Sequence, residues 1–142
     1  MNTTRIDPPP DVYGFLQLCA DRRYHRKTMA AFEAVTGLRA DQYWIEASAG
    51  GAPALGVSTD TARFAYGQGA RVMGWAAHGD NCGGFPGLDD DEIQAKLRTA
   101  VAELSCDFPE ATHWILFASG GEVEVDGGDD AGAAGYRGGP GG

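Results

Sequence analysis

The sequence predicts an α/β fold, with a mainly parallel central sheet of four to five strands flanked by helices. Short apolar runs alternate along the chain with segments in which apolar residues recur at three- and four-residue steps, and this alternation is typical of strands joined by crossover helices. The length of 142 residues corresponds to a single domain, and 43% hydrophobic residues suffice for a globular core. Right-handed crossovers between successive strands predict mostly parallel pairing.

The first strand is predicted at 15–19, where the sequence reads FLQLC. A helix follows, because Met29, Phe32 and Val35 stand three residues apart and share one helical face. Gly37 is predicted to end this helix as its C-terminal cap, since glycine readily adopts the left-handed conformation that such a cap requires.

Two further strands lie in the middle of the chain. The second strand is predicted at 43–47 and leads into a glycine-containing loop at 49–53. A shorter helix is expected at 59–66, and the third strand, at 71–77, runs directly into the segment HGDNCGG. Because the carboxyl ends of strands hold the functional residues of parallel sheets, chemistry is expected in the loops after these strands.

The most regular helical pattern follows that segment. Four acidic residues at 89–92 stand where the positive end of a helix dipole favours negative charge, and Pro109 predicts that the helix ends near Phe108. The apolar stripe of this helix consists of Ile93, Leu97, Val101 and Leu104. A continuously apolar fourth strand is predicted at 114–117, and a short edge strand at 122–125.

Both ends of the chain are predicted to lie outside the folded domain. Residues 1–12 contain three consecutive prolines and are expected to form an extended Pro-rich lead-in. Residues 127–142 are mostly Gly, Ala and Asp, and they have too few apolar side chains to offset the entropy of ordering, so a flexible Gly-rich tail is expected. The single α/β domain is therefore predicted to span 13–126.

The composition excludes several classes of partner. Eleven Lys and Arg against 20 Asp and Glu give a formal net charge of −9, which repels phosphate backbones and anionic lipid surfaces, so neither nucleic acid nor a membrane is expected. No segment approaches the roughly 18 apolar residues of a membrane helix. The odd number of three cysteines and the absence of a signal-like apolar stretch argue against secretion. We expect a cytoplasmic protein whose cysteines are packing residues or metal ligands.

Two of the cysteines and one histidine are predicted to converge at one edge of the sheet. Cys19 ends the first strand, and His78 and Cys82 follow the third. Two thiolates and an imidazole suit Zn²⁺, with a fourth tetrahedral position left for water or a carboxylate. Asp21 could take that position or orient a zinc-bound water, held by an ion pair with Arg23. On spacing alone, two packed thiols and a partly exposed ion pair are an equally good interpretation.

These segments resemble the β-class carbonic anhydrases, in particular short bacterial members of that family. The sequence CADRR at 19–23 matches the Cys-x-Asp-x-Arg motif of the family, and Cys82 with the two glycines after it matches the second thiolate segment. The sequence AGGA at 49–52 stands where the family has its glycine-containing loop. The resemblance extends over 15–125 in order and spacing.

The resemblance implies a zinc lyase that hydrates carbon dioxide reversibly to bicarbonate and works as a homodimer or a higher homo-oligomer. It implies that the Asp21–Arg23 pair is catalytic, with Asp21 orienting the zinc-bound hydroxide, and that Gly50 and Gly51 belong to the substrate loop. The implied Zn²⁺ ligands are Cys19, His78 and Cys82.

One spacing departs from the family pattern. The family has His-x-x-Cys, whereas three residues separate His78 from Cys82 here, so that Gly79 stands at the ligand position of the family. Either Gly79 lets the loop bulge so that His78 still reaches the metal, or the site lacks its imidazole. We favour the bulge, because glycine accommodates an additional backbone turn at low cost. In the second case Asp80 could serve as an oxygen ligand, His25 could replace the imidazole, or zinc could be absent.

Two alternatives to carbon dioxide hydration stay open. The longer loop is compatible with a non-catalytic binding or assembly module that keeps a structural zinc or has lost it. An activated hydroxide could also attack a related small molecule such as carbon disulfide. Cys106 and His113 are interpreted as residues outside the site, as is His25 if His78 reaches the metal.

Overall fold

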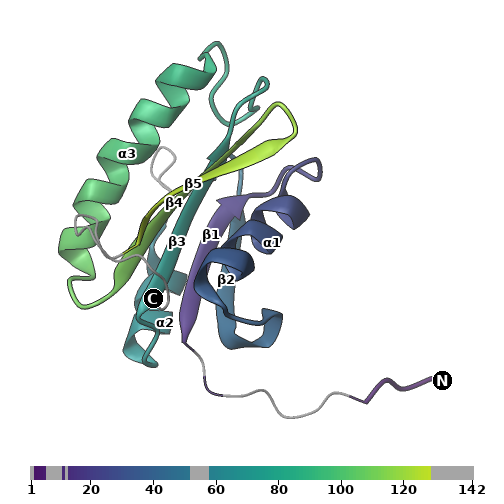
Figure 1. Cartoon of the computed structure of the whole chain (residues 1–142), viewed down its shortest axis with the longest axis vertical. Coiled ribbons are helices and arrows are strands. Elements are labelled where there is room, and N and C mark those ends of the chain that lie inside the picture. The colour runs from purple at the N-terminus through teal and green to yellow at the C-terminus, as the bar shows by residue number, and fades with distance from the viewer. Residues whose placement is uncertain (1, 6–10, 12, 52–57, 129–142) are drawn as a thin grey trace.

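The computed structural model of the chain describes residues 2–5, 11, 13–51 and 58–128. Within these residues, five strands and three α-helices succeed one another in the predicted order (Figure 1). Their bounds are β1 (Gly14–Cys19), α1 (His25–Thr36), β2 (Tyr43–Ser48), α2 (Asp60–Gly67), β3 (Val72–His78), α3 (Asp90–Asp107), β4 (Thr112–Ser119) and β5 (Glu122–Gly128). A 3₁₀ turn at Ala40–Gln42, which the sequence pattern does not predict, precedes β2.

The strands form one sheet in the order β2-β1-β3-β4-β5. β1 pairs in parallel with β2 and β3, and β3 pairs in parallel with β4, whereas β5 is antiparallel to β4. The antiparallel strand follows from its short connection, because Gly120 and Gly121 have φ values of 60° and 86°, as a two-residue hairpin turn of the primed type requires. The predicted fold class, a mainly parallel α/β sheet, is confirmed.

The helices begin and end where the sequence indicates. α1 ends at Gly37, which has a left-handed φ of 77° and donates its N–H to the Glu33 carbonyl. At the start of α3, Asp89 accepts from the backbone N–H of Glu92, and the Glu92 side chain accepts from the backbone of Asp89, which forms a capping box. No helix in the described part of the chain combines the length and the apolar character needed to cross a membrane.

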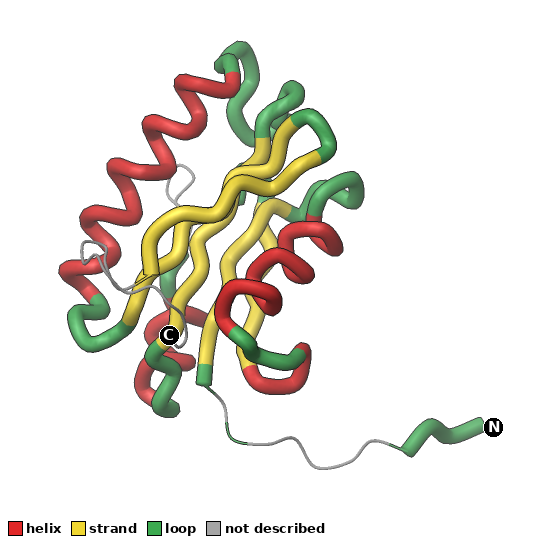
Figure 2. Tube along the Cα trace, viewed as in Figure 1, coloured by secondary structure: helices red, strands yellow, loops and turns green. Residues whose placement is uncertain are grey.

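Helices cover both faces of the sheet (Figure 2). On one face α2 and α3 enclose the larger core cluster, which contains Phe15, Trp75 and Phe117 of the sheet. On the other face α1 packs through Phe32 on a smaller cluster around Leu16. All six residues of β1 are buried, which explains why a strand in the middle of a parallel sheet reads as a nearly continuous apolar run.

The last strand continues into the first residues of the segment predicted as a tail. β5 pairs with β4 as far as Gly128, so the first two residues of the segment 127–142 belong to the sheet. Backbone hydrogen bonds of a ladder need no side chains, and glycines can therefore extend the strand. Residues 129–142 and the prolines at 8–10 lie outside the described residues, and the predicted domain bounds 13–126 stay a prediction.

β4 contains a buried histidine whose two ring nitrogens both have partners. Trp75 Nε1 donates to His113 Nδ1 at 3.0 Å, and His113 Nε2 lies 3.0 Å from the Phe108 carbonyl oxygen, to which it donates. Burial lowers the pKa of His113 below its ordinary value of 6.5. Protonation of Nδ1 would place a charge in the core and remove the acceptor for Trp75.

We therefore expect the contribution of His113 to the free energy of unfolding to be largest above pH 6.5 and to fall below it, where the unfolded chain binds a proton at His113 that the folded chain resists. Each unit by which folding lowers this pKa corresponds to about 1.4 kcal/mol. His113→Gln can donate and accept in similar places without titrating, so its loss of stability should be smaller. Urea unfolding of the wild type and of His113→Gln at pH 8 and pH 5.5 measures how far the free energy of unfolding falls in each. An equal fall in both proteins would contradict the prediction that His113 causes it.

Candidate metal centre

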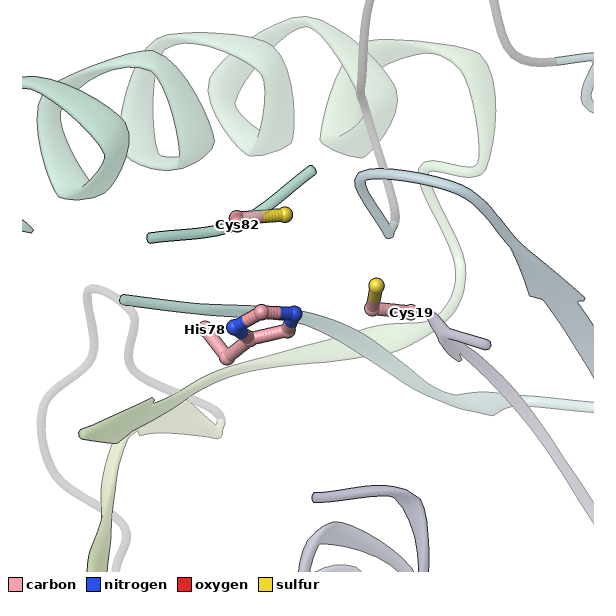
Figure 3. A group of neighbouring side chains, drawn as sticks. All are labelled: Cys19, His78 and Cys82. Atoms are coloured by element: carbon pink, nitrogen blue, oxygen red, sulfur yellow. The ribbon is translucent and has the colours of Figure 1, made fainter. Parts of the chain in front are cut away.

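The site lies at the carboxyl ends of two neighbouring parallel strands. Cys19 is the last residue of β1, His78 is the last residue of β3, and Cys82 lies in the loop that follows β3. All three side chains are buried, and their ligand atoms all lie within 4.8 Å of one another. Figure 3 shows the two sulfur atoms and the imidazole ring gathered at this edge. Among the described residues, no other group of His, Cys, Asp or Glu could hold a metal in this way.

The His78 ring presents one unpartnered nitrogen to this group. Nδ1 lies 2.6 Å from the carbonyl oxygen of Gly79, to which it donates, and this contact assigns the proton of the neutral ring to Nδ1. Nε2 is buried without a hydrogen-bond partner and lies 3.6 Å from Asp21 Oδ2. A histidine that donates from one nitrogen to a backbone carbonyl and leaves the other free is the usual form of a metal ligand. The buried, orphaned Nε2 therefore fits a metal site.

The two thiols differ in acidity. Burial raises the pKa of Cys19, but the His78 ring and the backbone N–H groups of Asp21 and Gly50 outweigh it, so the pKa of Cys19 lies below its ordinary value. Burial and the neighbouring Cys19 thiolate raise the pKa of Cys82. Cys19 is thus the more acidic of the two thiols, and a metal bound here would displace the proton of Cys82.

Asp21 and Arg23 form a tight pair beside the group of Cys19, His78 and Cys82. Arg23 Nη2 donates to Asp21 Oδ2 at 2.9 Å and Nε donates to Oδ1 at 3.1 Å, while the backbone N–H of Arg23 donates to Oδ1 at 2.8 Å. Hydrogen bonds from the side chain and backbone of Arg23 hold the pKa of Asp21 well below its usual range. Asp21 is therefore an ionised carboxylate with a fixed orientation next to His78.

The residue added between His78 and Cys82 is accommodated differently from the expected bulge at Gly79. Asp80 and Asn81 adopt left-handed φ values of 55° and 65°, a conformation that Asp and Asn tolerate better than most residues. Gly79 has another reason to be small, because a Cβ atom there would overlap the Asp90 carboxylate. With this turn, His78 itself joins the cysteines.

The other candidate ligands lie outside the three-residue group. The Asp80 carboxylate accepts hydrogen bonds from Tyr24 and Gly120, and His25 is the first residue of α1. Cys106 is exposed on α3. His113 lies near the start of β4, whereas His78 pairs with Ala118 near the end of that strand.

The glycine loop after β2 packs backbone against backbone. Gly50 and Gly51 are buried and have φ values of 86° and 82°. A Cβ atom on Gly51 would overlap the carbonyl oxygen of Ala76 in β3, and one on Gly84 would overlap the backbone of Gly50. The loop thus closes over the end of β3 and the segment after Cys82. Its predicted contact with substrate is untested, and residues 52 and 53 lie outside the described part of the chain.

Two residues near the site escaped the sequence reasoning. Tyr24 stacks on the His78 ring, with centroids 4.5 Å apart and an interplanar angle of 22°, and no local pattern signals this contact. Gln17 is 1% exposed, and its Nε2 has no hydrogen-bond partner. It stands two residues before Cys19 and therefore on the same face of β1. The single polar residue in the apolar run FLQLC could have indicated that Gln17 is buried near the strand end.

Comparisons with known proteins agree with the fold. No protein-family model matches the chain, and no curated protein sequence matches it. Among solved structures, the chain is similar to a carbonic anhydrase from Streptococcus mutans, with 19% sequence identity, 87% of each chain covered and a TM-score of 0.58. At this identity the likeness shows the fold: the chain has the α/β fold of a bacterial carbonic anhydrase. The resemblance suggested by its motifs is confirmed at that level.

We expect Gly51→Ala to destabilise the protein more than Gly37→Ala. Both glycines have φ near 80°, but a Cβ atom at Gly37 meets nothing within 4 Å. Gly37→Ala should cost only the left-handed strain, about 1–2 kcal/mol, and Gly51→Ala about 1–3 kcal/mol more because of the overlap. Urea unfolding of both variants tests this, and equal costs would show that the loop is not packed as described.

Proposed function

We propose that this chain is a zinc lyase that hydrates carbon dioxide reversibly to bicarbonate. The observation that carries the proposal is the buried group of Cys19, His78 and Cys82 on the fold of a carbonic anhydrase. Two sulfur donors and one imidazole nitrogen suit borderline-soft Zn²⁺, and three protein ligands are typical of catalytic zinc sites. Zinc, when bound, supplies a Lewis acid that brings the pKa of a water molecule near neutrality.

In this proposal Asp21 is the orienting residue. Its carboxylate stays ionised because Arg23 holds it with three hydrogen bonds within 3.1 Å, and it lies 3.6 Å from the ligand nitrogen of His78. It can accept a hydrogen bond from the nucleophile and keep a lone pair directed at carbon dioxide. Release from Arg23 would let Asp21 reach the fourth ligand position, so the pair can also act as a gate.

The surroundings suit a small neutral substrate. The formal charge of −9 does not repel carbon dioxide. The ligand side chains are buried, whereas the side chains of Asp21 and Arg23 are 20% and 44% exposed, so we assign entry and release to that side. Gly50 contributes a backbone N–H to Cys19, and we assign it with Gly51 to the wall of the substrate site.

Zinc analysis combined with stopped-flow carbon dioxide hydration tests the proposal. We expect one zinc per chain and measurable hydration in the wild type. Cys82→Ser should lose both, because it replaces a thiolate ligand, whereas Cys106→Ser should keep both, because Cys106 is exposed and outside the group. Asp21→Asn should retain zinc and lose about a hundredfold or more in rate through misorientation of the nucleophile.

Other outcomes favour the remaining candidates. Stoichiometric zinc without hydration would support a non-catalytic module with a structural metal, which the lengthened loop between His78 and Cys82 suggests. Zinc-dependent hydrolysis of carbon disulfide without carbon dioxide hydration would show that carbon disulfide is the substrate. A folded protein that binds no zinc would refute the metal site.

We also propose that the partner of this chain is a second copy. β2 is an edge of the sheet, and exposed apolar side chains flank it, with Ile45 at 44% and Phe64 of α2 at 53%. The opposite edge, β5, carries Glu122, Glu124 and Asp126, and such charges discourage strand pairing. The open, apolar edge β2 is therefore the better surface for a dimer that extends the sheet.

Light scattering coupled to gel filtration tests this arrangement. The wild type should elute with the mass of a dimer, and Ile45→Lys should shift it toward the monomer, because a charge is placed on the apolar edge. The matched control Glu122→Lys, on the edge strand β5, should leave the mass unchanged. A monomeric wild type, or equal behaviour of the two variants, would contradict the proposal.

A further inference from the structure

Asp80, one of the three residues between His78 and Cys82, is anchored from several elements. The Asp80 carboxylate accepts from the Tyr24 hydroxyl at 2.7 Å and from the backbone N–H of Gly120 at 3.0 Å. The Asp80 backbone N–H donates to Asp90 Oδ1 at 3.1 Å. Asp80 thus connects the start of α1, the turn between β4 and β5, and the start of α3.

Tyr24 links Asp80 to the candidate metal centre. Side chains of a strand alternate between its faces, so His78 leaves β3 on the same side as Ala76, which belongs to the core cluster on the α1 face. Tyr24, the N-cap of α1, covers that side and stacks on the His78 ring at 4.5 Å. The Tyr24 hydroxyl is in turn held by Asp80.

The same two residues also contact Arg23. Its guanidinium carbon lies 5.0 Å above the centre of the Tyr24 ring, and its Nη2 donates to the Asp80 carbonyl oxygen at 3.5 Å. The arginine that orients Asp21 and the histidine of the ligand group therefore share one support, which we call the Asp80–Tyr24 strut.

We propose that Asp80 and Tyr24 are positioning residues, which hold the His78 ring so that Nε2 faces Cys19 and Cys82 in spite of the longer loop. The inference rests on the proposed metal site. Two constraints act on the ring: the Nδ1 contact with Gly79 prevents it from flipping, and the stacked Tyr24 fixes its plane. Without the Asp80 carboxylate, the Tyr24 hydroxyl and the Gly120 N–H lose their acceptor, and the left-handed turn at Asp80 and Asn81 loses its anchor.

The first experiment tests the strut in the metal-free protein. The stacked Tyr24 should give the ring protons of His78 a ring-current shift, and the chain has only three histidines to assign. Asp80→Gly removes the carboxylate but keeps a residue that adopts positive φ without strain. It should move the His78 signals toward those of an unstacked histidine. Asp91→Asn, an exposed acid in the first turn of α3, should not.

The second experiment measures metal affinity with Co²⁺, whose sulfur-to-cobalt absorption reports thiolate ligation. Asp80→Gly and Tyr24→Phe should each weaken Co²⁺ binding, by about tenfold to a hundredfold for loss of a group that orients a ligand. The double variant should be little weaker than either single one, because both remove the same support. Asp80→Asn should recover most of the affinity, because its amide oxygen can accept from Tyr24. Tyr13→Phe, at an exposed tyrosine, is the matched control.

The outcomes separate this inference from the proposed function. Unchanged His78 signals in Asp80→Gly would overturn the strut whether or not the chain binds metal, and so would wild-type Co²⁺ affinity in Asp80→Gly. If the wild type shows no sulfur-to-cobalt absorption, the proposed metal site fails, and the metal-free spectra alone decide on the strut. Thermal unfolding of each metal-free variant separates positioning from general destabilisation, because positioning lowers the affinity in a variant that stays folded at the assay temperature.

Discussion

The parallel pairing of β1 with β3 is the constraint on which the candidate site depends. In this register Gln17 lies opposite Trp75, so both strands end at the same edge of the sheet. Side chains alternate between faces, and a slip by one residue would turn one strand's side chains to the wrong side. The core contacts of Phe15 with Trp75 resist such a slip. The packing that stabilises the fold therefore also sets the distance between Cys19 and His78.

Close backbone contacts then give the site its rigid walls. Gly51 packs on the carbonyl of Ala76, and Gly84 packs on the backbone of Gly50. At both places a side chain would push two backbone segments apart. The short distances bring backbone N–H groups to the Cys19 thiol, where they stabilise its charged form. The glycines near the strand ends therefore allow the close approach that lowers the pKa of Cys19.

Local patterns were sufficient for the elements and for bringing Cys19, His78 and Cys82 to one edge of the sheet, but not for the contacts that support these residues. The acidic run at 89–92 and the glycine at position 37 are local signals, and the helix ends that they predicted are found in the structure. The turn at Asp80 and Asn81 was instead attributed to Gly79, because glycine is the usual residue for an added turn. The reason for the actual turn is a hydrogen bond between residues 56 positions apart, which no spacing rule contains.

The longer loop between His78 and Cys82 also bears on the choice between an enzyme and a structural zinc module. An added residue gives a loop more conformations to lose when its ends are brought together, so an unsupported loop of this length would hold His78 less precisely. A chain that needed only a structural metal could tolerate that loss. Here Asp80, within the longer loop, is itself an anchor, and its partner Tyr24 contacts both His78 and the arginine that holds Asp21. A structural metal would require only that His78 be held. The contacts of Asp80 and Tyr24 with Arg23 also fix Asp21, and this favours a site in which the orientation of the Asp21 carboxylate matters.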